Sequence, residues 1–456
     1  MKRSFLTSIL AVVFALSVSA QNPDAVRKSL ESYPNLANPV ASTYPSIPLG
    51  EIASTPEEFE PFYFTMVGRH GSRYEQDNKR FAELRAMLDK AYELGILTKD
   101  GEVLRTRATA IHKAQEGHDG ELSELGVEQW RGIAHRAYNN FGKVFDQGSI
   151  EAKSSTSLRC VLSMAAFNDA IKEKNPTIKV KQQARKSELW IVRPLANNPA
   201  VSKRTKELCA EYHKQGEWNK ARKEWEQAYD GSAFLAKITT DSKRFIDECN
   251  GKSSGRVVRH AFISLLFGEN FGLGDRELIN RLFSIDDLYY VYVYMTSHWV
   301  NFTIGRGNEF VEARQSHMEA MVEDILDKCN AAIKGVNPNS ANLRFTHDSY
   351  VGPLLSVIGY DGCVPQWNEN IELAATSFNH GTNVPMAANL QIVLYRNKAG
   401  KVYVRSLINE RDATLPIKCK TGVFYPWEVF EKYVSNNLKM LKKSEESILK
   451  RDKLWQ

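Results

Sequence analysis

The sequence contains few of the patterns that mark metal or cofactor sites. Its six cysteines are widely spaced among 456 residues and none forms a Cys-x-x-Cys pair, which argues against a zinc site. A glycine-rich phosphate loop and a dinucleotide-binding fingerprint are both missing, so the usual nucleotide-binding folds are not indicated. We therefore expect neither a metal ion nor another cofactor. Eight histidines lack metal-ligand spacing and are interpreted as structural: His112, His118, His135, His213, His260, His298, His317 and His380.

Charge of one sign does not accumulate along the chain. Lys and Arg total 60, Asp and Glu total 54, and the basic residues are scattered rather than arranged in a stripe. Nucleic acid is therefore not expected as a partner. The exception is the segment 439–453, whose interspersed Leu and Glu residues predict an amphipathic, solvated terminal helix. The mild positive excess of +6 suits a small anionic ligand.

Long hydrophobic runs are confined to the N-terminus. Lys2 and Arg3 precede an apolar run over residues 5–18, and Val18-Ser19-Ala20 is typical of a cleavage site. This pattern predicts a signal peptide over residues 1–20, cleaved after Ala20, rather than an uncleaved anchor. No other stretch is long and apolar enough to cross a bilayer. We therefore expect a secreted or periplasmic protein with no integral membrane span and a charge of +6 − 2 = +4.

The cysteines leave two interpretations open. An exported chain with an even number of cysteines permits disulfide bonds, and their pairing is not determined by the sequence. Cys160 lies in an apolar helical pattern and is equally consistent with a buried free thiol. The remaining cysteines are Cys209, Cys249, Cys329, Cys363 and Cys419.

Hydrophobic periodicity predicts both strands and helices in the flanking parts of the chain. Apolar or alternating runs predict strands over 62–67, 342–346, 388–395 and 401–407, the last two joined as a hairpin. Residues 21–55 and 98–107 are expected to be irregular. Helical spacing predicts helices over 78–94, 157–171 and 351–358, and a further helix opened by Ser123 as its N-cap. The stripe expected to be buried on the second of these comprises Leu158, Val161, Leu162, Ala165 and Ala166.

The middle of the chain differs in character. Residues 184–336 are rich in helical patterns and scattered aromatic residues, whereas strands and helices alternate on either side. We therefore predict an α/β fold, a sheet flanked by helices, formed by residues 21–183 and 337–456. Residues 184–336 would form an inserted α-helical domain.

One stretch carries a chemical signal. The predicted strand 62–67 leads into Arg69-His70-Gly71-Ser72-Arg73, where two guanidinium groups stand beside one imidazole. Arginine forks match the oxygens of a phosphate group, and an imidazole nitrogen can act as a nucleophile toward phosphorus. On its own, the stretch is equally consistent with a solvated surface loop.

Two further segments carry residues of the same chemical type. Arg159 lies in the first turn of a predicted helix after a probable strand end, and His347-Asp348 follows another predicted strand. Ligands of open α/β sheets bind at the carboxyl ends of strands, so these loops are expected to converge on the Arg69-His70 turn. Arginines and histidines around one point would hold a tetrahedral oxyanion, and a carboxylate beside them could protonate a leaving alkoxide.

The ordered set of motifs resembles the histidine phosphatase superfamily, in the branch of histidine acid phosphatases, phytases and multiple inositol polyphosphate phosphatases. It comprises the Arg69–Arg73 turn, the segment 120–126, the segment 154–167 with Arg159, His347-Asp348 and the segment 403–409. His347 follows His70 by 347 − 70 = 277 residues.

The resemblance implies metal-independent hydrolysis of a phosphomonoester in two steps. His70 would attack phosphorus and form a phosphohistidine, and Asp348 would protonate the leaving alcohol and then assist the attacking water. The remaining site residues would hold the phosphoryl oxygens: Arg69, Arg73, Arg159 and His347.

The substrate implied by the resemblance is a small phosphorylated molecule. Many phytase-like members have a proline soon after the second arginine, whereas Tyr74-Glu75-Gln76-Asp77 stands here. Acidic residues at a pocket mouth disfavour a highly charged inositol phosphate, although the segment 126–134 resembles the inositol polyphosphate phosphatases. The alternatives are a broad-specificity acid phosphatase acting on sugar or nucleotide monophosphates and a non-catalytic relative that binds a phosphorylated ligand. A phosphoglycerate mutase relative is disfavoured by the signal peptide and the chain length. The oligomeric state is left open.

Overall fold

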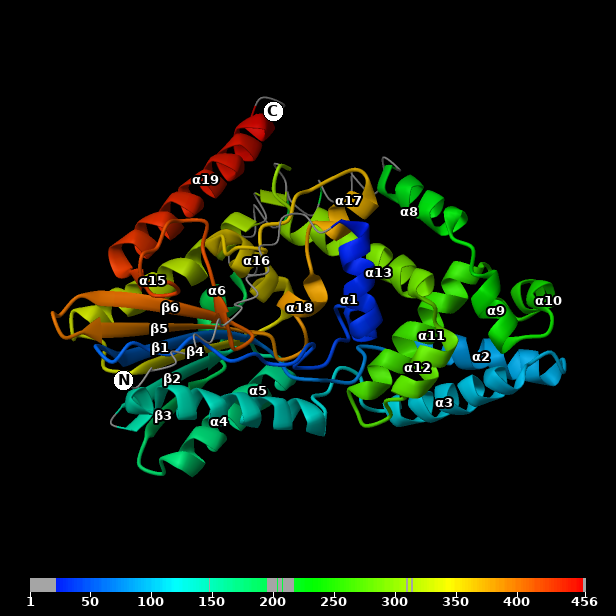
Figure 1. Ribbon diagram of the computed structural model, residues 1–456, viewed down its shortest axis with the longest axis horizontal. Helices are drawn as coiled ribbons and strands as arrows, with labels where there is room; N and C mark the ends of the chain where they lie inside the picture. Colours follow the sequence, from blue (N-terminus) through cyan, green and yellow to red (C-terminus); the bar gives the residue numbers. More distant parts are fainter. Residues whose placement is uncertain are drawn as a thin grey trace, which may run out of the picture.

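The computed structural model describes residues 22–146, 148–194, 217–308 and 315–453, together with positions 203, 207, 311 and 312 (Figure 1). The predicted signal peptide and Cys209 lie outside the described residues. None of the described helices is long and apolar enough to cross a membrane. The five described cysteines, Cys160, Cys249, Cys329, Cys363 and Cys419, are free thiols.

One mixed sheet organises the fold. Its strand order is β3-β2-β4-β1-β5-β6-β7, with β8 paired to β6. β1 to β4 run parallel where they pair, whereas β5 to β8 are antiparallel to their neighbours. The predicted α/β class, a sheet flanked by helices, is confirmed. The bounds are β1 Phe59–Arg69, β2 Ser149–Ser154, β3 Lys179–Gln183, β4 Ala341–Thr346, β5 Asn389–Asn397, β6 Val402–Ile408, β7 Arg411–Ala413 and β8 Tyr425–Pro426.

Alternating side chains of β1 supply both faces of the sheet with core residues. Tyr63 and Val67 pack with one apolar cluster, and Phe64 and Met66 pack with another. The first cluster is covered by α15 (Glu319–Ile333), α16 (Asp348–Ile358) and α19 (Trp427–Lys453), and the second by α4 (Glu124–Asp146) and α5 (Leu158–Lys174). Figure 1 shows these helices above and below the sheet, so the sheet is the middle of three layers.

A helical lobe lies beside the sheet, on the right in Figure 1. Its core joins helices from both sides of residue 184, including Phe81 of α2, Leu104 of α3 and Phe262 of α11. The division of the chain into 21–183 with 337–456 and an insert of 184–336 stays a prediction. The bounds are α2 Lys79–Glu93, α3 Lys99–Gln115, α8 Glu217–Ala228, α9 Ser232–Ile238, α10 Ser242–Glu248, α11 Ser254–Glu269, α12 Arg276–Leu282 and α13 Ile285–Trp299.

Short helices complete the connections between the sheet and the lobe. The N-terminal arm carries α1, and three more lie near the sheet or the lobe: α6, α17 and α18. Their bounds are α1 Pro23–Ser32, α6 Leu189–Val192, α17 Ile371–Thr376 and α18 His380–Asn383.

The prediction of irregular structure is wrong for parts of two segments. Residues 23–32 form α1 and residues 99–115 form α3, and each helix begins at a capping residue. Thr98 accepts a hydrogen bond from the N–H of Gly101, and this cap begins α3 through the polar stretch 98–107. Asn22 caps α1 in the same way, with Pro23 at the first helical position, where the missing N–H has no cost. The polar residues on the solvent-facing side of these helices resemble the composition of a loop, which led to the wrong prediction.

The predicted buried stripe of α5 is wrong at two positions. Leu158 is 65% exposed and Leu162 is 41% exposed, whereas Cys160 and Phe167 are buried against the sheet. Because α5 is apolar on several faces, its spacing alone did not determine which face contacts the sheet. The Ser123 N-cap is confirmed, since its hydroxyl accepts a hydrogen bond from the N–H of Gly126 (3.3 Å).

Candidate active site

The carboxyl ends of three parallel strands lie at one edge of the sheet. Arg69 at the end of β1 pairs with Thr346 of β4, and Ser154 at the end of β2 pairs with Phe345. The residues that follow each strand therefore meet. They surround a cavity of about 200 Å³ that is lined by His70, Arg73, Gln76, Ser157, Arg159, Arg193, His347, Asp348, Ser349 and Tyr350. Of the six predicted site residues, five line the cavity, and the sixth, Arg69, lies behind it.

A close approach of two glycines shapes the turn that carries His70. A Cβ atom at Gly71 would lie 2.4 Å from the carbonyl oxygen of Gly126, and one at Gly126 would lie 2.2 Å from that of Ser72. The N–H of Ser123 also donates to the Ser72 carbonyl oxygen (2.9 Å). The segment 120–126 is thus a support for the turn rather than part of the cavity wall.

The His70 imidazole is buried and set in one tautomer. Its Nδ1 lies 2.9 Å from the carbonyl oxygen of Gly71, which can only accept, so Nδ1 carries the proton and Nε2 keeps its lone pair. Burial lowers the pKa of His70 well below its ordinary value, and the positive charges of Arg69 and Arg73 lower it further. His70 is therefore a neutral nitrogen base at neutral pH.

Three arginines give the cavity its positive charge. Arg73 is almost fully buried and its Nη1 donates to the carbonyl oxygen of Tyr74 (2.6 Å). Arg159 lies in the first turn of α5, where burial lowers its pKa. Ser163 connects this turn to the loop that carries His70, because its hydroxyl donates to the Arg159 carbonyl oxygen (2.8 Å) and accepts from the N–H of Gly71 (3.0 Å). The third is Arg193, just after α6.

Arg69 forms a buried ion pair with Asp348. Its Nη2 lies 2.9 Å from Oδ2 of Asp348 and 2.9 Å from the carbonyl oxygen of Val40, and its Nη1 donates to that of Val384 (2.9 Å). Burial lowers the pKa of Arg69 to about 10. Burial raises the pKa of Asp348, but the charges of Arg69 and Arg73 outweigh it, and the net pKa is lowered.

His347 occupies the N-cap position of α16 and faces His70. The two ring centroids are 5.5 Å apart. Its Nε2 lies 3.2 Å from the Ser155 hydroxyl and 3.4 Å from that of Ser157. Burial lowers the pKa of His347 to about 4, with a further contribution from Arg159. The neutral ring can donate a hydrogen bond into the cavity from the nitrogen that does not accept one.

The profile of the histidine phosphatase superfamily (branch 2) matches residues 63–409. The chain belongs to this family. Its match spans every motif described above, from β1 to the end of β6. A comparison with curated protein sequences finds no match.

Solved structures show the same fold. The apo form of the Bifidobacterium longum multiple inositol polyphosphate phosphatase has a TM-score of 0.68 and is 17% identical, covering 88% of this chain and 96% of that chain. Its complex with inositol hexasulfate has a TM-score of 0.64 at 16% identity and covers 84% and 94%. The phytase from D. castellii has a TM-score of 0.58 at 16% identity and covers 89% and 85%. At these identities the likeness shows the fold.

Sequence reasoning missed several residues around the site. Arg193, Gln76 and Tyr350 line the cavity, but only Gln76 and Tyr350 lie close to a motif in the sequence. Val40 lies in the N-terminal arm and Val384 in a loop after α18, and both act through backbone carbonyls, which leave no signal in the sequence. The described residues contain no group of three or more His, Cys, Asp or Glu side chains that could hold a metal ion.

The cluster of cations around the cavity predicts anion binding. Inorganic phosphate is expected to raise the melting temperature, and at a concentration 100-fold above Kd the free energy of unfolding should rise by about 2.7 kcal/mol. Arg159→Gln should weaken this effect at least about tenfold in Kd, because a charged donor to the anion is lost. Thermal unfolding with phosphate, and with sodium chloride at equal ionic strength, measures the difference.

The matched control for Arg159 is Arg131→Gln. Arg131 is an exposed arginine of α4 that pairs with Glu173, away from the cavity. The Arg131→Gln variant should show the same rise in melting temperature with phosphate as the wild-type protein. A specific anion site would be contradicted if sodium chloride raised the melting temperature as much as phosphate does. It would also be contradicted if both variants lost the same part of the phosphate effect.

Proposed function

We propose that the protein is an exported, metal-independent phosphomonoesterase that acts through a phosphohistidine on His70, with inositol polyphosphates as its substrates. The observation that carries the proposal is a buried, neutral imidazole at a cavity lined by three arginines and one carboxylate. A neutral imidazole is a nucleophile, and the arginines provide positive charge where a phosphoryl group would lie. Membership of the histidine phosphatase superfamily supports the same chemistry.

In the first step, Nε2 of His70 attacks phosphorus in line with the ester oxygen. The N–P bond forms as the bond between phosphorus and the ester oxygen breaks, and the electron pair of that bond goes to the leaving oxygen. Asp348, in its protonated form, donates its proton to this oxygen, so the product leaves as a neutral alcohol. The Gly71 carbonyl oxygen accepts a hydrogen bond from Nδ1–H of His70, and this bond stabilises the positive charge that develops on the ring.

The phosphoryl oxygens would be held by Arg73, Arg159 and His347. Uncatalysed hydrolysis of phosphomonoesters is slow enough that acceleration reaches ~10²¹-fold in the best enzymes. A loose phosphoryl-transfer transition state responds mainly to positioning and to fixed positive charge. Arginines already fixed in place supply this charge without a metal ion, and Arg69 adds charge behind the nucleophile while it orients Asp348.

In the second step, water attacks the phosphohistidine. Asp348, now a carboxylate, accepts a proton from the water as the new P–O bond forms and the P–N bond breaks. Inorganic phosphate leaves and His70 returns to its neutral form. The same carboxyl group therefore serves as acid and then as base. The lowered pKa of Asp348 favours the carboxylate of the second step, whereas the negative charge of a bound phosphate ester would favour the protonated form that the first step needs.

Export is part of the proposal because of the N-terminal sequence. The pattern of Lys2, Arg3, an apolar run and Val18-Ser19-Ala20 is that of a cleaved signal peptide. Substrate class is proposed from the charge of the cavity and from the relatives. Arg193 lies at the wall beside Arg159, and a relative of the same fold has been solved with inositol hexasulfate.

Replacing the nucleophile tests the mechanism. His70→Ala should reduce phosphate release from an aryl phosphate by at least about 10⁴-fold, as expected when a covalent nucleophile is lost. Acid quenching of the wild-type enzyme with a ³²P-labelled substrate should trap label on the protein, and the variant should trap none. Full activity should persist in EDTA.

The control for this variant is His135→Ala, which removes a half-exposed histidine of α4 that pairs with Glu173. It should retain wild-type activity and labelling. A His70→Ala variant with full turnover would sink the phosphohistidine mechanism.

The role of Asp348 predicts a dependence on the leaving group. Asp348→Asn should lower kcat by about 10²–10⁴-fold with alkyl phosphates, which need a proton at the leaving oxygen, and by less than about tenfold with activated aryl phosphates. Because protonated Asp348 is required, wild-type activity should fall as pH rises. The lowered pKa of His70 keeps the nucleophile neutral at acid pH, so the optimum should be acidic. Equal losses on both substrates would argue against proton donation.

A substrate panel tests the substrate class. Phosphate release measured with malachite green should give a higher kcat/KM with inositol hexakisphosphate than with sugar or nucleotide monophosphates, because the polyanion can reach Arg193 as well as the inner cations. Equal or higher values for the monophosphates would favour the broad-specificity acid phosphatase. Stabilisation by ligand without turnover would favour the non-catalytic relative.

A further inference from the structure

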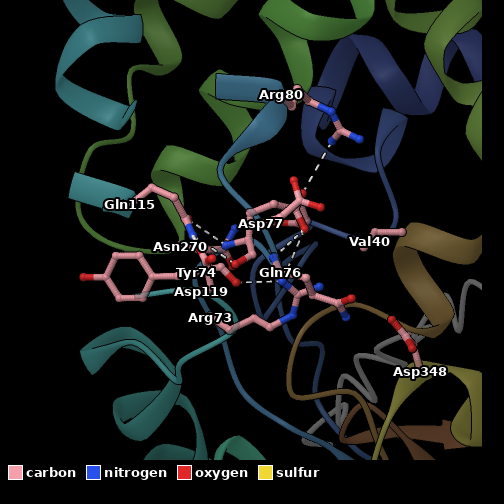
Figure 2. Close-up of polar contacts among 12 residues, drawn as sticks. Val40, Arg73, Tyr74, Gln76, Asp77, Arg80, Gln115, Asp119, Asn270 and Asp348 are labelled. Carbon is pink, nitrogen blue, oxygen red and sulfur yellow. Dashed lines mark hydrogen bonds and ion pairs between the residues drawn. The ribbon is translucent and has the colours of Figure 1, made fainter. Parts of the chain in front are cut away.

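The segment that leaves the cavity after Arg73 is held by one buried glutamine. Oε1 of Gln115, at the end of α3, accepts from the N–H of Glu75 (2.9 Å), and its Nε2 donates to the Glu75 carbonyl oxygen (3.0 Å). The N–H of Gly120 donates to the same oxygen (2.7 Å). Because Gln115, labelled in Figure 2, is fully buried, these hydrogen bonds hold the backbone at position 75 in one place.

The Glu75 carboxylate bridges two arginines. Its Oε1 lies 3.5 Å from Nη1 of Arg73, and its Oε2 lies 3.5 Å from Nη1 of Arg80 on α2. Figure 2 shows Arg80 on the opposite side of this segment from Arg73. The Glu75 side chain is 15% exposed and that of Arg73 is 3% exposed, so solvent screens their interaction weakly. Arg80 is 33% exposed and is screened more strongly.

The neighbouring residues divide between the cavity and the fold. Gln76 is exposed and lines the cavity, and its N–H donates to Oε1 of Glu75 (2.9 Å). Asp77 does not line the cavity, and its Oδ1 accepts from the N–H of Lys79 (3.0 Å), where α2 begins. Of the two acidic residues in this segment, Glu75 is the one that forms an ion pair with a residue of the cavity, Arg73.

We propose that Glu75 is a specificity-determining residue that limits how many negative charges the cavity accepts. Its negative charge offsets part of the positive charge of Arg73, which lines the cavity, and of Arg80, which does not. A ligand with a single anionic group carries little charge and needs to contact only the arginines beside His70. A ligand with several anionic groups extends past Gln76 toward the mouth, where each added charge meets the Glu75 carboxylate. This inference rests on the proposed phosphate-ester site.

Glu75→Gln removes the charge and keeps the shape and the acceptor for the Gln76 N–H. The inhibition constants of inorganic phosphate and of inositol hexasulfate are measured against hydrolysis of an aryl phosphate. The variant should bind the hexasulfate more tightly relative to phosphate, by about threefold or more, because the Coulomb energy scales with ligand charge. The difference should shrink at high ionic strength. A ratio of inhibition constants does not depend on the fraction of folded enzyme.

Arg80→Gln provides a second test with the opposite sign. It leaves the Glu75 charge less compensated, so the hexasulfate should bind more weakly relative to phosphate. Asp77→Asn is the matched control, since it removes one nearby negative charge and retains the acceptor for the Lys79 N–H. It should leave the ratio unchanged.

The outcomes separate this inference from the proposed function. If wild-type enzyme hydrolyses the aryl phosphate while Glu75→Gln leaves the ratio unchanged, or shifts it no more than Asp77→Asn does, the role of Glu75 is overturned and the proposed function stands. If the wild-type enzyme neither hydrolyses the aryl phosphate nor binds phosphate by calorimetry, both are overturned.

Discussion

The buried ion pair between Arg69 and Asp348 is the interaction on which the site depends. Burial of two charges costs several kcal/mol per ion unless their remaining donors and acceptors have partners. Here the carbonyl oxygens of Val384 and Val40 accept hydrogen bonds from Nη1 and Nη2 of Arg69, whereas its buried Nε has no partner among the described residues. One side chain thus connects the end of β1, the start of α16, the N-terminal arm and the loop after α18. The position of the carboxylate at the cavity is set by all four segments together.

The electrostatics of the cavity follow from confining like charges. Arg73, Arg159 and Arg193 lie around a neutral imidazole, and the Nε atoms of all three are buried without a hydrogen-bond partner among the described residues. Mutual repulsion and burial make such a cluster unfavourable for folding in the absence of an anion. A bound anion would relieve this repulsion. Because the arginines are already held around the cavity, they would need to move little to contact it. Burial, together with the positive charges of Arg69 and Arg73, lowers the pKa of His70, so the confinement that gathers the arginines also keeps the imidazole neutral.

The segment 74–77, which follows Arg73, shows how the contacts of a charged residue change its expected effect. An acidic segment beside an anion site suggests repulsion when only the sequence is considered. In the structure, Glu75 has two arginine partners, and Asp77 holds the first turn of α2. The two arginines offset part of the Glu75 charge, and this pairing is the basis of the role proposed for Glu75.

The sequence determined the local elements and the chemical types of the site. Strand periodicity located β1, β4, β5 and β6, and the strand-to-turn motifs placed His70, Arg159 and His347-Asp348 at strand ends, because these signals depend on neighbours along the chain. It did not determine which face of α5 packs on the sheet, since Leu158 and Cys160 are both apolar. Cap residues at Asn22 and Thr98 were present in the sequence, and so were the apolar residues that α1 and α3 bury, Val26 with Leu30 and Leu104 with Ala108 and Ile111, so these two helices were predictable.

The tertiary structure alone decided the rest. Arg193 comes from a segment distant in the sequence, and Val40 and Val384 act through backbone carbonyl groups, which every residue has. Their contribution depends on distances of about 3 Å, which are set by the register of parallel strands and by the close packing of Gly71 on Gly126. The sequence by itself thus determined which chemistry is available, whereas packing decided the positions and charge states of the groups that perform it.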